Sequence, residues 1–138
     1  MAYEYNRNLR DKNYETTLTI DGTNGASVSS SAFDLEQVTG GDIEKVVVEV
    51  VVPAVAGNTN TAESIDFAIQ DSADNSSFAA LDPAIDWSVA GVASTGSVAT
   101  TKRFRLPPGT RRYIKLVQTE TGDGFTDADQ VVTFRLLF

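Results

Sequence analysis

Cysteine and histidine are both absent from this chain of 138 residues. Without cysteine there is no disulfide, no thiolate nucleophile and no cysteine-ligated zinc, which excludes a small secreted disulfide scaffold. Without histidine there is no Ser-His-Asp triad, no imidazole base and no histidine ligand for zinc or copper. Catalysis would therefore need paired carboxylates, a lysine or a tyrosine in a defined pocket. We expect a protein that is not an enzyme and holds no cofactor.

Long apolar runs are missing as well. The longest, Val46–Ala56, is interrupted by Glu49 and contains Pro53, and it is shorter than the roughly 20 apolar residues that cross a bilayer as a helix. The N-terminal residues 1–13 are polar and lack the apolar segment of a secretory signal. The sequence therefore predicts no contact with a membrane. We expect the chain to work where it is made, or to be carried elsewhere by assembly.

The charges are unevenly distributed along the chain. A net charge of −8 argues against nucleic acid as a partner, because proteins that bind it are usually basic overall. Lysine and arginine are absent between residues 46 and 101, and acids are absent between residues 87 and 119. The basic residues that follow are concentrated in one segment, Lys102–Lys115. This separation of charge favours contacts between copies of the chain.

Short alternating or β-branched segments follow one another from residue 14 to the C-terminus. Ile43–Val52 comes after two glycines and ends at Pro53, and its valine runs indicate a strand covered on much of both faces. Ser64–Gln70 alternates between apolar and polar or small residues, which is typical of a strand with one buried face. Further strands are expected within Glu15–Ile20, 24–32, Phe78–Leu81, Ala84–Thr100, Lys102–Leu106, Arg112–Thr119 and Val131–Phe138.

These segments predict an all-β fold of about seven or eight short strands joined by turns rich in Gly, Pro, Asn and Asp. No segment has a sustained helical period with caps. Such a pattern is typical of a sandwich or barrel, and we expect a β-sandwich of jelly-roll type. The length suits one domain, residues 14–138. Residues 1–13 have no periodicity and predict an extended arm, either disordered or ordered only against a partner.

Two acidic segments are candidate cation sites. The tract Asp71–Asn75 lacks the spacing and the glycine of a calcium loop, and Asp and Asn are favoured in turns, so we interpret it as a turn. The segment Gly122–Asp129 holds Asp123, Asp127 and Asp129 and is the better candidate, with a solvated hairpin loop as the alternative. Neither has a recognised ligand spacing, so we predict no metal site.

Asp82 and Asp86 precede Trp87, the one tryptophan of the chain. Two carboxylates beside an aromatic ring suggest a glycosidase pair with a sugar platform. That chemistry requires a defined separation between the carboxylates, which spacing along the chain does not give. A tryptophan in the core or in an interface is the interpretation that we favour.

The basic segment and the arm supply the candidate interface residues. If the strand Lys102–Leu106 formed a hairpin with the strand that begins at Arg112, their arginines would gather into one positive patch. Arginine is enriched at protein interfaces and pairs with carboxylates, whereas few aromatic groups are present for stacking bases; a solvated strand face is the alternative. The arm adds tyrosine and arginine, residue types that contribute much binding energy, unless it is only a solubilising tail. The candidates are Tyr3, Tyr5, Arg7, Arg10, Arg103, Arg105, Arg111 and Arg112.

Two tracts carry a resemblance to a known family. The tract Ile65–Phe78, with its Gln-Asp-Ser-Ala-Asp turn, and Arg111–Leu116 after Pro107-Pro108-Gly109 resemble the jelly-roll cement, or decoration, proteins of tailed-bacteriophage capsids. A hydrophobic C-terminal strand adds to the likeness, which covers residues 40–138. The resemblance implies a virion structural protein: a homotrimer made in the host cytoplasm that binds the outside of the assembled shell, with the major capsid protein as its partner.

A different function remains open beside this one. The chain could be a β-sandwich module that binds carbohydrate or a cell surface. Such a protein should present several exposed aromatic side chains beside Asp or Asn. Here Trp87 is the one tryptophan, and three of the four tyrosines, Tyr3, Tyr5 and Tyr14, lie in or beside the arm. That distribution favours an arm that docks on a partner.

Overall fold

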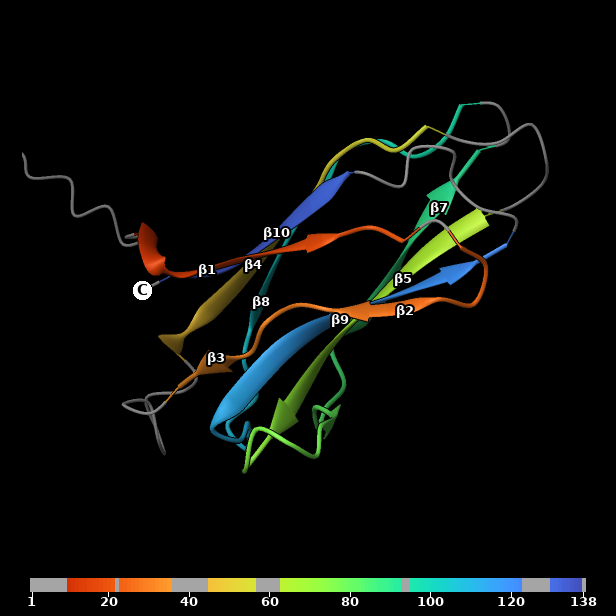
Figure 1. Ribbon diagram of the computed structural model, residues 1–138. Coiled ribbons are helices and arrows are strands. Elements are labelled where there is room, and N and C mark those ends of the chain that lie inside the picture. Colours follow the sequence, from red (N-terminus) through yellow and green to blue (C-terminus); the bar gives the residue numbers. More distant parts are fainter. Residues whose placement is uncertain are drawn as a thin grey trace, which may run out of the picture.

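The computed structural model describes residues 10–21, 23–35, 45–56, 63–92, 95–122 and 130–137. Within them the chain forms ten strands: β1 (Arg10–Thr19), β2 (Ser27–Ser29), β3 (Phe33–Asp34), β4 (Val47–Val52), β5 (Glu63–Ser72), β6 (Ala79–Ala80), β7 (Asp86–Gly91), β8 (Thr100–Arg105), β9 (Tyr113–Thr121) and β10 (Val131–Leu137). The strands make two antiparallel sheets that face each other (Figure 1). The expected all-β sandwich of jelly-roll type is confirmed.

The strand order explains how distant segments meet. One sheet has four strands in the order β1-β10-β4-β8. The other has six: β2-β9-β5-β6 form a path, β3 pairs with β9, and β7 pairs with β5. The count exceeds the seven or eight strands expected from sequence; β2 and β6 lie within the expected segments 24–32 and Phe78–Leu81, whereas the two-residue strand β3 lies outside all of them. Strands this short leave no periodic pattern in a sequence.

The four-stranded sheet is centred on β4 and β10. Val48 and Val50 of β4 are fully buried between the sheets, and Phe134 of β10 is buried beside them. On the outer face of β4, Val47 and Val51 are half-buried, while Glu49 is only 1% exposed. The valine runs of β4 are therefore covered on much of both faces, as the sequence indicated. On the outer face, the arginine side chains that pair with Glu49 cover part of the strand.

The six-stranded sheet is built around the long pairing of β5 with β9, which runs from Ser64↔Thr121 to Ser72↔Tyr113. The alternation of β5 is observed as expected: Ile65, Phe67 and Ile69 face the core. Trp87 of β7 also packs inward, with its ring 5.2 Å from that of Phe67 and 4.9 Å from that of Phe104. The tryptophan is thus a core residue, and the outward residues of β5, β7 and β9 form a polar sheet face.

The structure differs from what was expected of the basic segment and of the arm. The strands β8 and β9 do not form a hairpin: β8 pairs with β4 in one sheet and β9 with β5 in the other. Pro107 and Pro108 separate them, and a proline donates no backbone hydrogen bond to a ladder. In addition, β1 begins at Arg10, which belongs to the segment 1–13 expected to form the arm. The backbone of Arg10 pairs with Leu137. No helix among the described residues is long and apolar enough to cross a membrane.

Candidate functional site

The outer face of the six-stranded sheet carries two rows of side chains across β7, β5 and β9. Ser88, Asp66 and Thr119 occupy one row, because Asp66 pairs with Ser88 on one side and with Thr119 on the other. Asp86, Ala68 and Val117 occupy the next row in the same way. Since alternate residues of a strand point to the same face, both rows face outward. The centre of this face thus has small apolar residues flanked by polar ones.

A hollow of about 370 Å³ lies over these rows. Ala68 and Val117 have smaller side chains than most of the residues around them, which leaves the sheet surface hollowed at this point. Phe67 and Trp87 also border it, although the ring of Phe67 is buried in the core and stacks on that of Trp87. The residues that line the hollow are Asp66, Phe67, Ala68, Gln70, Asp86, Trp87, Ser88, Val117 and Thr119.

Asp66 is held in a fixed orientation by hydroxyl groups. Its Oδ1 accepts hydrogen bonds from Ser88 and, at 3.4 Å, from Ser64, and its Oδ2 accepts one from Thr121 at 3.0 Å. The donors come from β7, from β5 itself and from β9, so the network ties three neighbouring strands together. A carboxylate has about four lone-pair positions, and these three hydroxyls occupy most of them.

Asp86 differs from Asp66 because it has no such support. It is exposed at the start of β7, and its side chain makes no hydrogen bond or ion pair with the described residues. Lys115, which pairs across the strands with Gln70, lies with its Nζ 4.4 Å from the centre of the Phe78 ring. Among the described residues, no lysine or arginine lines the hollow. Of the Asp82 and Asp86 pair considered from sequence, only Asp86 lies at this site, and its neighbour there is Asp66.

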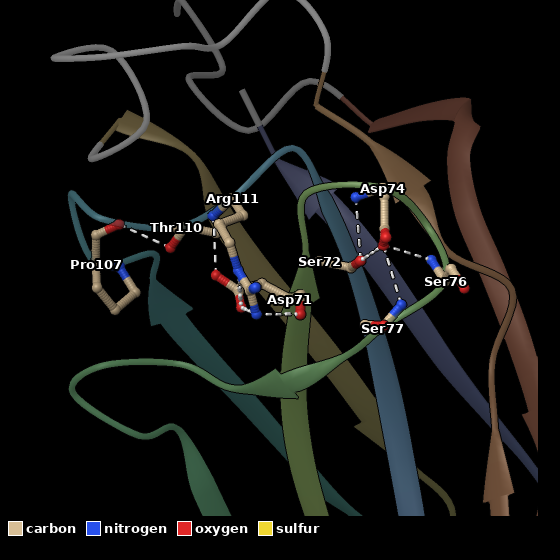
Figure 2. A network of polar contacts seen from close by, with 8 residues as sticks. All are labelled: Asp71, Ser72, Asp74, Ser76, Ser77, Pro107, Thr110 and Arg111. Atoms are coloured by element: carbon tan, nitrogen blue, oxygen red, sulfur yellow. Dashed lines mark hydrogen bonds and ion pairs between the residues drawn. The ribbon is translucent and has the colours of Figure 1, made fainter.

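Two turns are fixed at one end of the sandwich, where β5 ends and β9 begins (Figure 2). Asp71 is buried at the end of β5, and its Oδ1 accepts hydrogen bonds from Nε and Nη2 of Arg111 at 2.9 and 2.6 Å. Its Oδ2 accepts one from the backbone N–H of Arg111 at 2.9 Å. The hydrogen bond with Asp71 raises the pKa of Arg111. Thr110 closes the neighbouring turn by donating its hydroxyl to the carbonyl of Pro107 at 2.7 Å.

Asp74 organises the second turn in Figure 2. Its Oδ1 accepts hydrogen bonds from the backbone N–H groups of Ser77 and Ser76, at 3.0 and 2.9 Å, and from the hydroxyl of Ser72 at 2.8 Å. These bonds, the one from Ser77 first, lower the pKa of Asp74 to about 2. Asn75 adopts a positive φ of 59°, which Asn tolerates better than most residues. The acidic tract therefore forms a turn that is stabilised by hydrogen bonds from neighbouring residues to Asp74, as its composition indicated.

The candidate arginines come from two sheets, and three of them are held by carboxylates of the same chain. Arg103 on β8 contacts Glu49 at 2.7 Å. Arg111 contacts Asp71, and Arg112 makes two 2.9 Å hydrogen bonds to Asp34. Arg105 ends β8 and is exposed. Tyr3, Tyr5 and Arg7, and the loop with Asp123, Asp127 and Asp129, lie outside the described residues; of Arg10 only the backbone pairing is described.

An alternating row of charges crosses the outer face of the four-stranded sheet. Arg135 on β10 contacts Glu15 on β1 and Glu49 on β4, each at 3.4 Å, and Arg103 completes the row on the far side of Glu49. These residues are direct partners in the strand register. Opposite charges placed across strands stabilise a sheet. Sequence reasoning missed this row, since nothing in a single sequence shows which strands are neighbours.

Comparisons with known proteins give a distant likeness to other sandwiches. No protein-family model matches the chain, and no curated protein matches it. Among solved structures, one described as "CBM4 structure and function" is 13% identical with a TM-score of 0.41, over 98% of this chain and 79% of that one. The "xylan-binding module CBM15" is 14% identical with a TM-score of 0.40, over 93% and 94%. TmCBM61 in complex with β-1,4-galactotriose is 14% identical with a TM-score of 0.36, over 100% and 98%.

Proposed function

We propose that this chain is a non-catalytic recognition domain that binds carbohydrate in the hollow on the outer face of its six-stranded sheet. The observation that carries the proposal is the lining of that hollow. Asp66, Asp86 and Gln70 offer hydrogen-bond acceptors, and Gln70, Ser88 and Thr119 can donate. A concave site with a few convergent polar groups is typical of small-molecule recognition. Sugars, which present many hydroxyl groups around an apolar ring face, suit this combination.

The same lining predicts a modest affinity. In the described part of the chain no aromatic ring lies flat on the hollow, because Trp87 packs inward against Phe67 and Phe104. Hydrogen bonds to a sugar replace hydrogen bonds to water, so each contributes little net free energy. We expect a dissociation constant on the order of a millimolar, about −4 kcal/mol, for a short oligosaccharide.

The test is a titration of the protein with oligosaccharides of xylose, galactose and glucose, followed by NMR shifts of backbone amides. Shifts should concentrate on β5, β7 and β9. The variant Ala68→Ile fills the hollow with a residue that suits a strand and should abolish binding. Thr17→Ile is the matched control, because Thr17 is exposed on the outer face of the four-stranded sheet. Binding that survives Ala68→Ile, or no binding to any sugar, would contradict the proposal.

A second proposal is that the chain is the cement protein of a phage capsid, in the form of a homotrimer on the outer shell. What supports it is the contact between the two tracts that resemble that family. Asp71 belongs to the first tract and Arg111 to the second, and their hydrogen bonds fix both turns at one end of the sandwich. Rigid turns are suited to docking, because less conformational entropy is lost on binding.

Sedimentation with assembled shells tests this second proposal. If a major capsid gene lies beside the gene for this chain, the assembled shell of its product is the partner to use. The protein should sediment with expanded shells and should raise their melting temperature, because a ligand of the assembled state stabilises it. In solution it should scatter light as a trimer. A protein that stays monomeric at roughly 10 μM, well above the range of tight oligomers, and remains in the supernatant would rule out this role.

A further inference from the structure

The charge of the hollow narrows the class of sugar that it can accept. Asp66 and Asp86 are the charged residues of its lining. They occupy adjoining rows of the paired strands β5 and β7, since Asp66 pairs with Ser88 and Asp86 with Ala68. Residues placed diagonally across two strands are close enough to interact. Two carboxylates of like charge therefore face the same small volume, and none of the described residues that line it is a lysine or arginine.

The two carboxylates have different capacities for a ligand. Asp66 already accepts hydrogen bonds from Ser64, Ser88 and Thr121, so its main contribution is negative charge. Asp86 accepts none from the described residues and keeps all of its lone pairs for a ligand. Lys115, the nearby cation on β9, lies over the ring of Phe78 and does not line the hollow. The open group of the site is therefore an exposed carboxylate in a negative surrounding.

We propose that the hollow selects sugars that carry a protonated amino group, with the ammonium placed at Asp86. This inference rests on the proposed carbohydrate function and names the ligand class of the same site. An ammonium group brings three donors and a positive charge, and hydrogen bonds between charged groups are about twice as strong as neutral ones. A sugar acid brings negative charge to Asp66 and Asp86 and is repelled. An N-acetylated sugar lacks the charge and can offer Asp86 only the single, neutral donor of its amide N–H.

The expected preference is moderate because the site is open to solvent. Exposed ion pairs contribute up to about 1 kcal/mol, so an amino sugar should bind about fivefold more tightly than its N-acetylated form. The preference should shrink in high salt, because ions screen exposed charges. It should also vanish when Asp86 loses its charge, whereas loss of a charge elsewhere should leave it unchanged.

Calorimetric titration with matched oligosaccharides tests this inference. The probes are oligomers of glucosamine, N-acetylglucosamine and glucose of equal length, in buffer of about pH 5.5, where aspartate is ionised and amino groups are protonated. The variant Asp86→Asn removes the proposed partner of the ammonium group. Asp82→Asn is the matched control, because Asp82 is also an exposed aspartate but does not line the hollow. Melting curves of both variants establish that they are folded.

Each outcome separates this inference from the function on which it rests. A glucosamine preference that is lost in Asp86→Asn and kept in Asp82→Asn supports it. Equal affinity for all three oligomers overturns the selection for amino sugars but leaves carbohydrate binding in place. A preference that falls equally in both variants reflects net charge alone and overturns the assignment to Asp86. No binding by any of these three oligomers overturns the inference, and the titrations with xylose and galactose oligomers then decide the proposed function.

Discussion

Asp71 and Arg111 join the end of β5 to the connection that crosses from one sheet to the other. Both carboxylate oxygens of Asp71 and its backbone carbonyl accept hydrogen bonds from Arg111, the shortest at 2.6 Å. Asp71 is 5% exposed. The Leu106–Arg112 connection contains two prolines and joins strands of different sheets. Backbone hydrogen bonds hold its two ends, from the N–H of Leu106 to the carbonyl of Val46 and from the N–H of Leu35 to the carbonyl of Arg112. The ion pair with Asp71 adds an attachment to the end of β5.

The first prediction concerns this attachment. Asp71→Asn should lower the free energy of unfolding by about 2 kcal/mol, because a nearly buried charged partner of the guanidinium is lost. Asp34→Asn is the control: Asp34 and Arg112 are 39% and 44% exposed, and exposed pairs contribute less than about 1 kcal/mol. Urea denaturation measures both. Equal losses in the two variants would show that burial of Asp71 does not matter.

The second prediction concerns the pH dependence of the turn at Asp74. Its pKa is about 2 in the folded protein against an ordinary value of 3.8. Between these values the unfolded chain binds more protons, so stability rises with pH there. The contribution of Asp74 is thus complete above about pH 5 and is lost as the pH falls toward 2. Melting temperatures of the wild type and Asp74→Asn should differ at neutral pH and converge in acid. A constant difference would contradict the lowered pKa.

Alternation along single strands predicted much of the fold. Side chains of a strand point to alternate faces, so a period of two predicts which residues of Ser64–Gln70 face the core. Pairing between strands follows from no such local rule. The hollow depends on β5 lying between β7 and β9, and this alone places Asp66 beside Asp86. The sequence signal available was that Asp86 and Ser88 alternate with the inward residues Trp87 and Val89.

The basic segment also shows that a local pattern does not predict which residues meet across strands. Arg103 and Arg111 are close in sequence, which suggested one positive patch. In the fold Arg103 contacts Glu49 and Arg111 contacts Asp71, residues that are 54 and 40 positions away. Composition along the chain gives the local charge but not the distant carboxylates that neutralise it. Charge runs in β-sandwiches therefore predict surfaces poorly until the strand order is known.

The third prediction tests the row of charges on the four-stranded sheet. Glu49 is 1% exposed and lies between Arg103 and Arg135, whose side chains are 51% and 15% exposed. Glu49→Gln should lower the free energy of unfolding by about 3 kcal/mol, because the largely buried Arg135 then keeps only Glu15, which is 40% exposed, as a charged partner. The double variant Glu49→Leu/Arg135→Leu should recover most of that loss, since no unpaired buried charge remains. A double variant less stable than Glu49→Gln would contradict this account.

The fourth prediction separates packing from hydrogen bonding at Trp87. Its ring packs against Phe67 and Phe104, while its Nε1–H is buried and makes no hydrogen bond within the described part of the chain. Trp87→Ala should cost about 3–5 kcal/mol through the cavity that it leaves. Trp87→Phe should cost only about 1 kcal/mol, because the lost contacts are partly offset by removal of an unsatisfied donor. Urea unfolding followed by circular dichroism measures both; similar losses would contradict this division.

The fifth prediction concerns the N-terminal residues and where the strand that follows them begins. Because β1 starts at Arg10, which pairs with Leu137, a deletion of residues 2–9 leaves the whole strand, whereas a deletion of residues 2–12 removes its first residues. We expect the shorter deletion to change the free energy of unfolding by less than about 0.5 kcal/mol, because it leaves every described strand intact. The longer deletion should cost about 1 kcal/mol or more, because paired backbone of β1 is lost.

Self-association gives the same deletions a second readout. If Tyr3, Tyr5 and Arg7 dock on a neighbouring subunit, removing residues 2–9 should weaken the proposed self-association by several kcal/mol, the scale of two or three interface hot spots. The variant Tyr3→Ala/Tyr5→Ala should reproduce much of that effect without shortening the chain. Light scattering over a range of concentrations measures both proteins against the wild type. Since the shorter deletion spares β1, a folded variant that associates as tightly as the wild type would show that the tyrosines do not contribute to assembly.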